Sequence, residues 1–294
     1  MFSIIIPTYN NLNYLKICIN SIQKNSKYKH QIIVHVNEGK DGTIDYLKKK
    51  KIPYTWSYKN VGLCKGVNLA VQKSKKKYIV YSHDDFYFCP NWDLIFYNEI
   101  KKIKHNNFYL SGIMIGSEEK VSKKFGNDYK SFNENFFLNN YLKIKLKDYQ
   151  GSTWAPHIVH KDLWLKVGGF SEEFFPGAGS DPDLNMKLWN QKVRIFKGLA
   201  NCRVYHFESR TLRRTRKSFG TYASKLFLFK WKISINFFKK YYLRSGSFNT
   251  DVLNEPNLSL MYIVDLIKCK IHYLFIFLFN REIKKIFKNN EIKY

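Results

Sequence analysis

Two adjacent carboxylates, Asp84 and Asp85, directly follow the run 78–81, and His83 precedes them. That run is β-branched and aromatic, a composition typical of a buried strand. Carboxylate oxygens are the ligands that hard divalent cations prefer. The stretch therefore predicts a cation site at the tip of a strand. The alternative is an exposed acid pair that caps the helix expected to start near Asn91.

A second acidic cluster, with Asp181 and Asp183, lies in the run GSDPDLNMKLWNQ (179–191). A carboxylate in a pocket can accept a proton from a reacting hydroxyl, the work of a general base. Pro182 suits the first turn of a helix, so Ser180 or Asp181 could instead be its N-cap. Asp183 would then favour the positive end of the helix dipole without any catalytic role.

The elements that would position these acids alternate between strand and helix in the first half of the chain. Strands are expected at 3–8, 31–36, 54–58 and 78–82, and helices at 11–24, 41–50 and 65–74. This spacing predicts βαβ units and a mostly parallel sheet flanked by helices, an α/β fold. Ligands of such sheets bind beyond the carboxyl ends of the strands, where residues 7–10, 37–42 and 83–85 fall. The polar stretch 113–150 has no clean period and is predicted to be a long variable excursion.

Composition narrows the class of protein. The chain has 294 residues, 45% of them hydrophobic and 17% aromatic, which excludes a disordered protein. Its 50 basic and 23 acidic residues give a net charge of +27. This excess suits nucleic acid, an anionic membrane surface or a phosphorylated substrate. The alternative is that frequent Lys, Asn and Ile reflect an AT-rich genome.

Cysteines and apolar runs indicate the compartment. The five cysteines form no CxxC pair, so we expect neither a disulfide framework nor a thiolate zinc site, and we expect a reducing cytoplasm. The N-terminus has no signal-peptide pattern. The longest apolar run near the C-terminus, 271–279, is about half of a membrane span, so no transmembrane helix is predicted.

Three stretches resemble one family, the inverting family-2 glycosyltransferases with the GT-A fold. They are SIIIPTYNNLNYLKICINSI, NVGLCKGVNLAVQKSKKKYIVYSHDDFYFCPNW and GGFSEEFFPGAGSDPDLNMKLWNQ. Together they extend over residues 2–206, and their order and spacing are more specific than any one motif. The resemblance implies a Rossmann-like GT-A domain over 1–210. Residues 211–294 are then a helical, basic C-terminal extension, and residues 201–294 carry 19 basic against 6 acidic residues.

The resemblance also implies a metal site. The family's Asp-x-Asp motif falls on residues 83–85, which makes Asp85 the metal ligand and turns Asp84 toward ribose or sugar hydroxyls. His206 matches a position where the family often has another metal ligand, although a buried core histidine is the alternative. His83 replaces an acid of the motif and is expected to be a neighbour of the metal rather than a ligand. The implied cofactor is Mn²⁺ or Mg²⁺.

The nucleotide-sugar site would be formed by residues after the first three strands. By resemblance its members are Pro7, Thr8, Tyr9, Asn37, Asn60, Gly62 and Asn68, together with Asp84. The family usually has Asp-Asp or Asp-Asn where this chain has Val36 and Asn37. The loss of a carboxylate leaves a preference for uracil open, although the Asn37 amide can still read a base edge. Gly62 could instead simply end a strand, and Asn68 could be a surface residue of a helix.

On the acceptor side, the resemblance makes Asp181 the general base, with Ser180 in place of a glutamate. Trp154 is the best candidate to stack on a sugar, and Asp183 is a further acceptor candidate, while Trp164 and Trp189 are expected in the core. The run that holds Arg213, Arg214 and Arg216 could reach a diphosphate or lipid phosphate, or could simply be solvated.

The resemblance therefore predicts an enzyme that transfers a sugar, with inversion, from a nucleotide-diphosphate sugar to a hydroxyl of a saccharide or lipid-linked saccharide. Cell-surface polysaccharide or lipopolysaccharide synthesis is the expected setting, in the cytoplasm or peripherally at the cytoplasmic membrane face. The extension would contact an anionic membrane, or its run 271–279 would dock onto the first domain. Two alternatives remain: a nucleic-acid-binding protein, which is not the expected reading, and a catalytically silent relative that binds sugar nucleotides.

Overall fold

The first strand shows why this chain builds a central sheet. The side chains of Ile4, Ile5 and Ile6 alternate between the two faces of this strand, and all three are fully buried. This is expected for a strand that helices cover on both sides. The computed structural model describes residues 1–116, 125–126, 128–208 and 216–289. The strands are β1 (Ser3–Tyr9), β2 (Gln31–Asn37), β3 (Tyr54–Ser57), β4 (Tyr78–Tyr81), β5 (Phe86–Phe88), β6 (Tyr109–Ile115), β7 (Tyr149–Gln150), β8 (His157–His160) and β9 (Phe196–His206).

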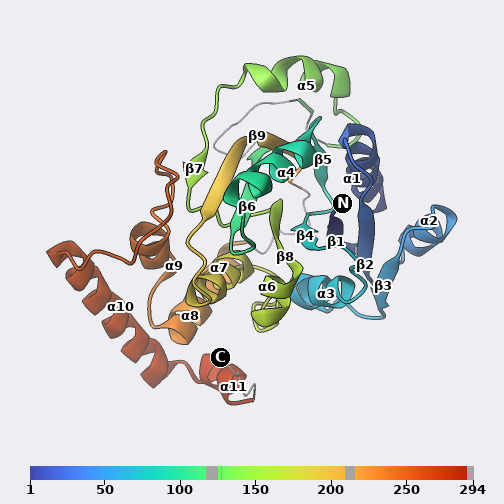
Figure 1. Ribbon diagram of the computed structural model, residues 1–294. Helices are drawn as coiled ribbons and strands as arrows, with labels where there is room; N and C mark the ends of the chain where they lie inside the picture. The colour runs from blue at the N-terminus through green and yellow to red at the C-terminus, as the bar shows by residue number, and fades with distance from the viewer. Residues whose placement is uncertain (117–124, 127, 209–215, 290–294) are drawn as a thin grey trace.

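Helices connect and cover these strands. They are α1 (Leu12–Asn25), α2 (Thr43–Lys49), α3 (Gly62–Val71), α4 (Trp92–Ile103), α5 (Glu134–Asn140), α6 (Lys161–Lys166), α7 (Ser180–Asn190), α8 (Arg216–Trp231), α9 (Ile235–Phe237), α10 (Leu260–Phe279) and α11 (Arg281–Asn289). A 3₁₀ turn, η1 (Tyr141–Lys143), follows α5, and a π-helical turn, η2 (Phe238–Tyr242), follows α9. Figure 1 shows α1 and α4 on one side of the sheet, with α3, α6 and α7 on the other.

The strand order is β3-β2-β1-β4-β8-β6-β9-β5, and β7 pairs with β9. Neighbours are parallel from β3 to β4, as the βαβ alternation predicts. The other half is mixed: β8 is antiparallel to β4 and β6, whereas β6 is parallel to β9. Only four residues, 82–85, connect β4 to β5, yet the two strands are not neighbours in the sheet. β5 pairs antiparallel with β9 at the far edge.

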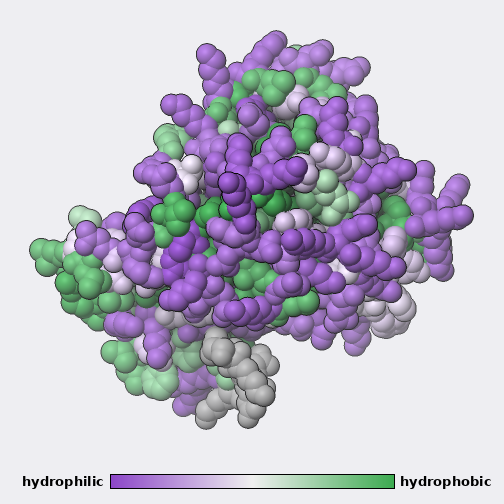
Figure 2. Space-filling model, in the orientation of Figure 1, coloured by the Kyte–Doolittle hydropathy of each residue, from purple (hydrophilic) through white to green (hydrophobic). Residues whose placement is uncertain are grey.

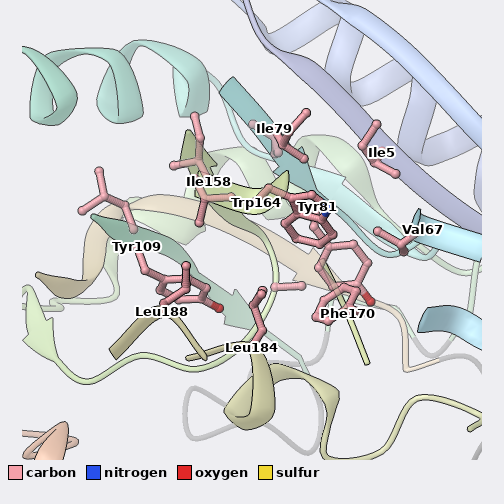
Figure 3. Packing of buried hydrophobic residues seen from close by; sticks show 14 of the residues in the cluster. Ile5, Val67, Ile79, Tyr81, Tyr109, Ile158, Trp164, Phe170, Leu184 and Leu188 are labelled. Atoms are coloured by element: carbon pink, nitrogen blue, oxygen red, sulfur yellow. The ribbon is translucent and has the colours of Figure 1, made fainter. Parts of the chain in front are cut away.

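One hydrophobic core joins the sheet, the helices and the C-terminal extension. Figure 3 shows part of this core, with Ile5 and Tyr81 from the sheet, Val67 of α3 and Leu184 of α7 among its members. Trp164 and Trp189 are buried in it, as predicted. Phe227 of α8 belongs to the same cluster. The predicted boundary near residue 210 therefore separates two stretches of sequence that share a core.

Local differences from the sequence prediction have simple causes. The helix expected at 65–74 begins earlier, at Gly62, and the one expected at 41–50 has Gly42 in a left-handed conformation as its N-cap. The predicted excursion 113–150 contains the end of β6, then α5, η1 and the start of β7, short elements that leave no periodic signal. All five cysteines are unpaired and buried. In the described ranges, no helix is both long and apolar enough to cross a membrane.

Candidate active site

The turn between β4 and β5 carries the first acidic cluster. The Ser82 amide donates to the Ile5 carbonyl (3.0 Å), which holds the start of the turn against β1. β5 then pairs with β9 in a register that places Phe86 opposite His206. The Phe207 amide donates to the Asp85 carbonyl (3.1 Å). These contacts bring the C-terminal end of β9 beside the acids of the turn.

His83, Asp85 and His206 form a compact donor group. Each offers one ligand atom, and these atoms all lie within 4.8 Å of one another. The His206 Nε2 atom is 3.4 Å from the Asp85 Oδ2 atom. Two imidazoles and one carboxylate suit a divalent cation, and imidazole nitrogens favour Mn²⁺ over the strictly oxygen-seeking Mg²⁺. The predicted ligands Asp85 and His206 are thus brought together, and His83, which we expected to be only a neighbour, joins them.

Asp84 points away from that group toward β1. Its carboxylate accepts a hydrogen bond from the Thr8 hydroxyl (2.6 Å). Burial, followed by repulsion from Asp85, raises the pKa of Asp84 to about 7. The N-cap of α4 is Asn91, and this cap uses no side-chain hydrogen bond. The capping role that the sequence left open for these acids therefore has no support in the described structure.

The predicted nucleotide residues fall at the carboxyl edge of the parallel strands. The amide group of Asn37 accepts from the Val61 backbone (2.9 Å), and Asn60 accepts from Gly62 (2.9 Å), so both organise the loop that leads into α3. Gly62 has φ of +80°, and a Cβ there would lie 2.7 Å from the Phe175 ring. Its glycine is thus required by conformation and close packing together.

Of the other predicted nucleotide-site residues, Asn68 and Pro7 have structural contacts, whereas Tyr9 is exposed. Asn68 is bound at both ends to the backbone of Phe170, at 2.7 and 3.0 Å, so it ties α3 to the segment before α7. Pro7 lies within β1, opposite His35 of β2. Tyr9 is 36% exposed at the end of β1 and remains available to stack on a base.

Asp181 lies in the first turn of α7, after the N-cap Gly179, so it does not cap this helix with its side chain. Its Oδ1 atom is 4.0 Å from the His157 Nδ1 atom. Neither that oxygen nor either His157 ring nitrogen has a hydrogen-bond partner among the described residues. Burial lowers the pKa of His157 to about 3, so a neutral ring faces the acid. Burial likewise raises the pKa of Asp181 to about 7, which suits a general base.

Asp183, two residues later, has the opposite surroundings. It is fully buried, and its carboxylate accepts from Trp231 Nε1 (2.8 Å) and Ser171 Oγ (2.5 Å). The Lys230 ammonium lies 2.9 Å from it and 2.7 Å from Glu173. This environment favours the structural role left open by the sequence over contact with an acceptor. Asp183 anchors α8 onto α7.

A hollow of about 330 Å³ opens in front of Asp181. Trp154 lines one side, and the C-terminal extension supplies another through Ala223 of α8 and Ile235 of α9. Lys239 of η2 also lines the hollow, with its Nζ atom 5.5 Å from the centre of the Trp154 ring. The predicted stacking residue and the predicted base therefore share one hollow, and the extension completes it.

Sequence reasoning missed two contributions. His157 carried no signal, because nothing in a strand sequence indicates which buried histidine will face a distant acid. Lys239 belongs to the basic extension, where one lysine among many could not be singled out. Arg213 and Arg214, predicted to reach a phosphate, lie outside the described residues, as does the side chain of Arg216.

Comparisons with known protein sequences identify related glycosyltransferases. The family model described as Glycosyl transferase family 2 matches residues 3–160. An uncharacterized glycosyltransferase of Rickettsia bellii (strain RML369-C) is 33% identical over 115 residues, which is 37% of this chain and only 16% of that relative.

Solved structures support the fold. The crystal structure of S. aureus TarS 1-349 superposes with a TM-score of 0.57 at 15% identity, covering 99% of this chain and 75% of that one. The same protein in complex with UDP-GlcNAc gives a TM-score of 0.54 at 16% identity, covering 99% of this chain and 76% of that one. At these identities the likeness concerns the fold alone.

Proposed function

The chain belongs to glycosyl transferase family 2, and from this premise we propose that it transfers one sugar, with inversion, from a nucleotide-diphosphate sugar to a hydroxyl acceptor in a metal-dependent reaction. The observation that carries this proposal is the group of His83, Asp85 and His206 at the carboxyl end of β4. A divalent cation bound there would neutralise the charge of the departing diphosphate.

The chain's own residues supply the other steps. Asp181 takes the proton from the acceptor hydroxyl as that oxygen attacks the anomeric carbon. Direct attack with a single base inverts the anomeric centre, and the transition state resembles an oxocarbenium ion. Asp84, which accepts a hydrogen bond from Thr8, faces hydroxyl groups of the donor. Tyr9 and the loop that Asn37 and Asn60 organise face the nucleobase of the donor. Trp154 stacks on the acceptor sugar beside Asp181.

A screen of nucleotide sugars tests this function. Purified protein is incubated with each donor, with Mn²⁺ or with EDTA, and free nucleotide diphosphate is measured. UDP sugars come first, because the TarS structure was solved with UDP-GlcNAc. We expect at least one donor to be hydrolysed with Mn²⁺ present and not with EDTA. Binding of a donor without turnover would favour the silent relative, and salt-sensitive oligonucleotide binding with no donor binding would favour the nucleic-acid alternative.

We further propose that the enzyme works peripherally at the cytoplasmic membrane face, with α10 against anionic lipid. α10 buries only a narrow stripe, formed by Tyr262, Cys269 and Ile276. Its opposite face exposes large apolar side chains, among them Ile267, Ile271, Leu274, Phe275 and Leu278. Figure 2 shows these apolar residues gathered over α10 at the edge of the molecule.

The charges beside this face argue for lipid over a second copy of the chain. Lys268 and Lys270 of α10 and Arg281 of α11 adjoin it, and each copy has a net charge of +27. Two such faces would repel each other, whereas anionic headgroups attract them and the aromatics enter the acyl boundary. A lipid-linked acceptor would then be met at that surface.

Vesicle co-sedimentation of the full chain decides this point. We expect binding to anionic vesicles at low salt and release at high salt. Phe275→Ser with Leu278→Ser should reduce binding strongly. Phe136→Ser with Leu142→Ser, which also removes two exposed apolar residues but from α5 and η1, should not. Equal binding by both double variants would remove the membrane role from α10.

A further inference from the structure

A second and larger hollow adjoins the one in front of Asp181. Its volume is about 1130 Å³, and Trp154 and Lys239 line both hollows. We call it the basic cleft, because Lys145, Lys147, Lys239, Lys240 and Arg244 line it. None of the described residues that line it is acidic.

The floor of the basic cleft is built by close pairing between β7 and the extension. The Gln150 amide donates to the Ser247 carbonyl (2.7 Å), and the Gly246 amide donates to the Gln150 carbonyl (3.0 Å). Gly151 has φ of +72°, and a Cβ there would lie 2.6 Å from the Leu243 carbonyl oxygen. Only glycine allows this approach, so Gly151 lets the chain after β7 pack directly against the backbone of the extension.

The cations of the basic cleft are not equivalent. Lys240 is paired with Asp265 (2.8 Å) on α10. Lys145, Lys147 and Arg244 are exposed and form no ion pair with any residue that the structure describes. A general excess of lysine would scatter such cations over convex surface. Here three converge on one concavity, where their fields add.

Aromatic faces accompany these charges. Tyr149, Trp154 and Phe248 line the basic cleft together with the cations. Aromatic faces pack against the apolar faces of sugar rings, whereas lysine and arginine bind phosphate or carboxylate. The combination therefore fits a saccharide that carries negative charge, and the shared Trp154 leads from the cleft toward Asp181.

We propose that the basic cleft binds the body of an anionic acceptor saccharide, bearing phosphate or carboxylate groups, while its terminal hydroxyl lies at Asp181. The proposal rests on the function proposed above and names the class of acceptor. Lys145, Lys147 and Arg244 line the cleft but not the hollow in front of Asp181, so they affect acceptor affinity and leave donor chemistry unchanged.

Binding measurements without donor test the proposal. Three dextran oligosaccharides of equal length are titrated into the full chain by calorimetry: a phosphorylated, a carboxymethylated and a neutral one. We expect at least one charged form to bind about tenfold or more tightly than the neutral form, with an advantage that falls at high salt. The tighter of the two charged forms identifies the preferred group.

Two variants locate the site. The cleft variant combines Lys145→Gln, Lys147→Gln and Arg244→Gln. The control variant combines Lys48→Gln, Lys49→Gln and Lys50→Gln, which removes the same charge from exposed positions in and after α2. Figure 1 shows α2 on the opposite side of the molecule from β7 and α9. The advantage of the charged form should vanish in the cleft variant and persist in the control.

Equal loss in both variants, or equal binding of charged and neutral oligosaccharides to the unaltered chain, would overturn the proposal. Donor hydrolysis by the same three proteins is a separate readout. It should be the same in all three, because the altered residues lie outside the donor site. Its absence from all three would contradict the proposed function, whereas the binding data would still decide the cleft.

Discussion

Asp84–Asp85 and Asp181–Asp183 are two acid pairs in the same chain with different fates. In the first pair both carboxylates remain at the sheet edge, one held by Thr8 and the other beside two histidines. In the second, Asp181 lines a hollow and its Oδ1 atom has no hydrogen-bond partner among the described residues, while Asp183 is buried against Lys230. The C-terminal extension causes this difference, because α8 brings Lys230 and Trp231 onto Asp183 only. The first pair thus places one carboxylate beside two histidines and the other against Thr8, whereas the second places one carboxylate at a hollow and the other against a buried lysine.

The largest effect is expected at the metal group. Asp85→Asn removes the carboxylate of the His83, Asp85 and His206 group. Because we propose that this group holds the cation, turnover should fall by about 10³-fold or more. The thermal unfolding midpoint should stay near that of the unaltered chain. Asp162→Asn, at a side chain that is 86% exposed, is the matched control and should change neither quantity. If Asp85→Asn retained metal-dependent turnover, Asp85 would not be a ligand of the catalytic metal.

Asp183→Asn should act on stability rather than on chemistry. The substitution removes one of the two carboxylates that pair with the buried Lys230, while Glu173 and the Ser171 hydroxyl still contact it. We therefore expect a loss of about 3 kcal/mol in the free energy of unfolding, the lower end for breaking a buried pair. Chemical denaturation measures this loss, again with Asp162→Asn as the control. An Asp183→Asn protein with unchanged stability and no transfer would reverse the roles of the two acids.

The pH dependence sharpens the contrast further. Burial raises the pKa of Asp181 to about 7, above the value near 4 of an unfolded aspartate. The stability that this carboxyl contributes is present below pH 4 and is lost as the pH rises through 7. Activity runs the other way, because the base must be ionised. We expect kcat/KM to rise about tenfold per pH unit below 7 and to level above it. A rate that is constant from pH 5 to 8 would exclude Asp181 as the base.

The smallest effect concerns the choice of metal. With two imidazoles among three donors, Mn²⁺ should activate the enzyme at lower concentration than Mg²⁺. His83→Asp restores an oxygen ligand and should narrow that difference, as measured by metal titration of donor hydrolysis. If the ratio of the Mn²⁺ and Mg²⁺ activation constants did not change, His83 would be a neighbour of the metal and not a ligand.

Much of the fold could be predicted from sequence because it depends on local pattern. The isoleucine run of β1 and the apolar helix faces that follow gave βαβ units, which the parallel half of the sheet confirms. The mixed half could not be predicted, because the pairing of β5 with β9 joins residues more than a hundred positions apart. No pattern within β5 names its partner.

In the candidate site, too, features that depend on contacts between distant residues could not be predicted from local pattern. Asp85 and His206 were proposed as ligands from a resemblance, and their proximity then follows from the β5–β9 register. The split between Asp181 and Asp183 was left open, because it depends on Lys230, some fifty residues away. The basic cleft was beyond prediction for the same reason, since its lining comes from β6, from residues 145–154 and from the extension.

The central claim is that Asp181 is the base of the transfer, and Asp181→Asn tests it most directly. Asparagine keeps the shape of the side chain but cannot take a proton at neutral pH. With the donor found in the screen, we measure donor affinity by calorimetry and transfer by product formation in the same preparation. We expect donor affinity to be unchanged and transfer to fall by about 10²–10⁴-fold. Transfer at the unaltered rate would contradict this claim.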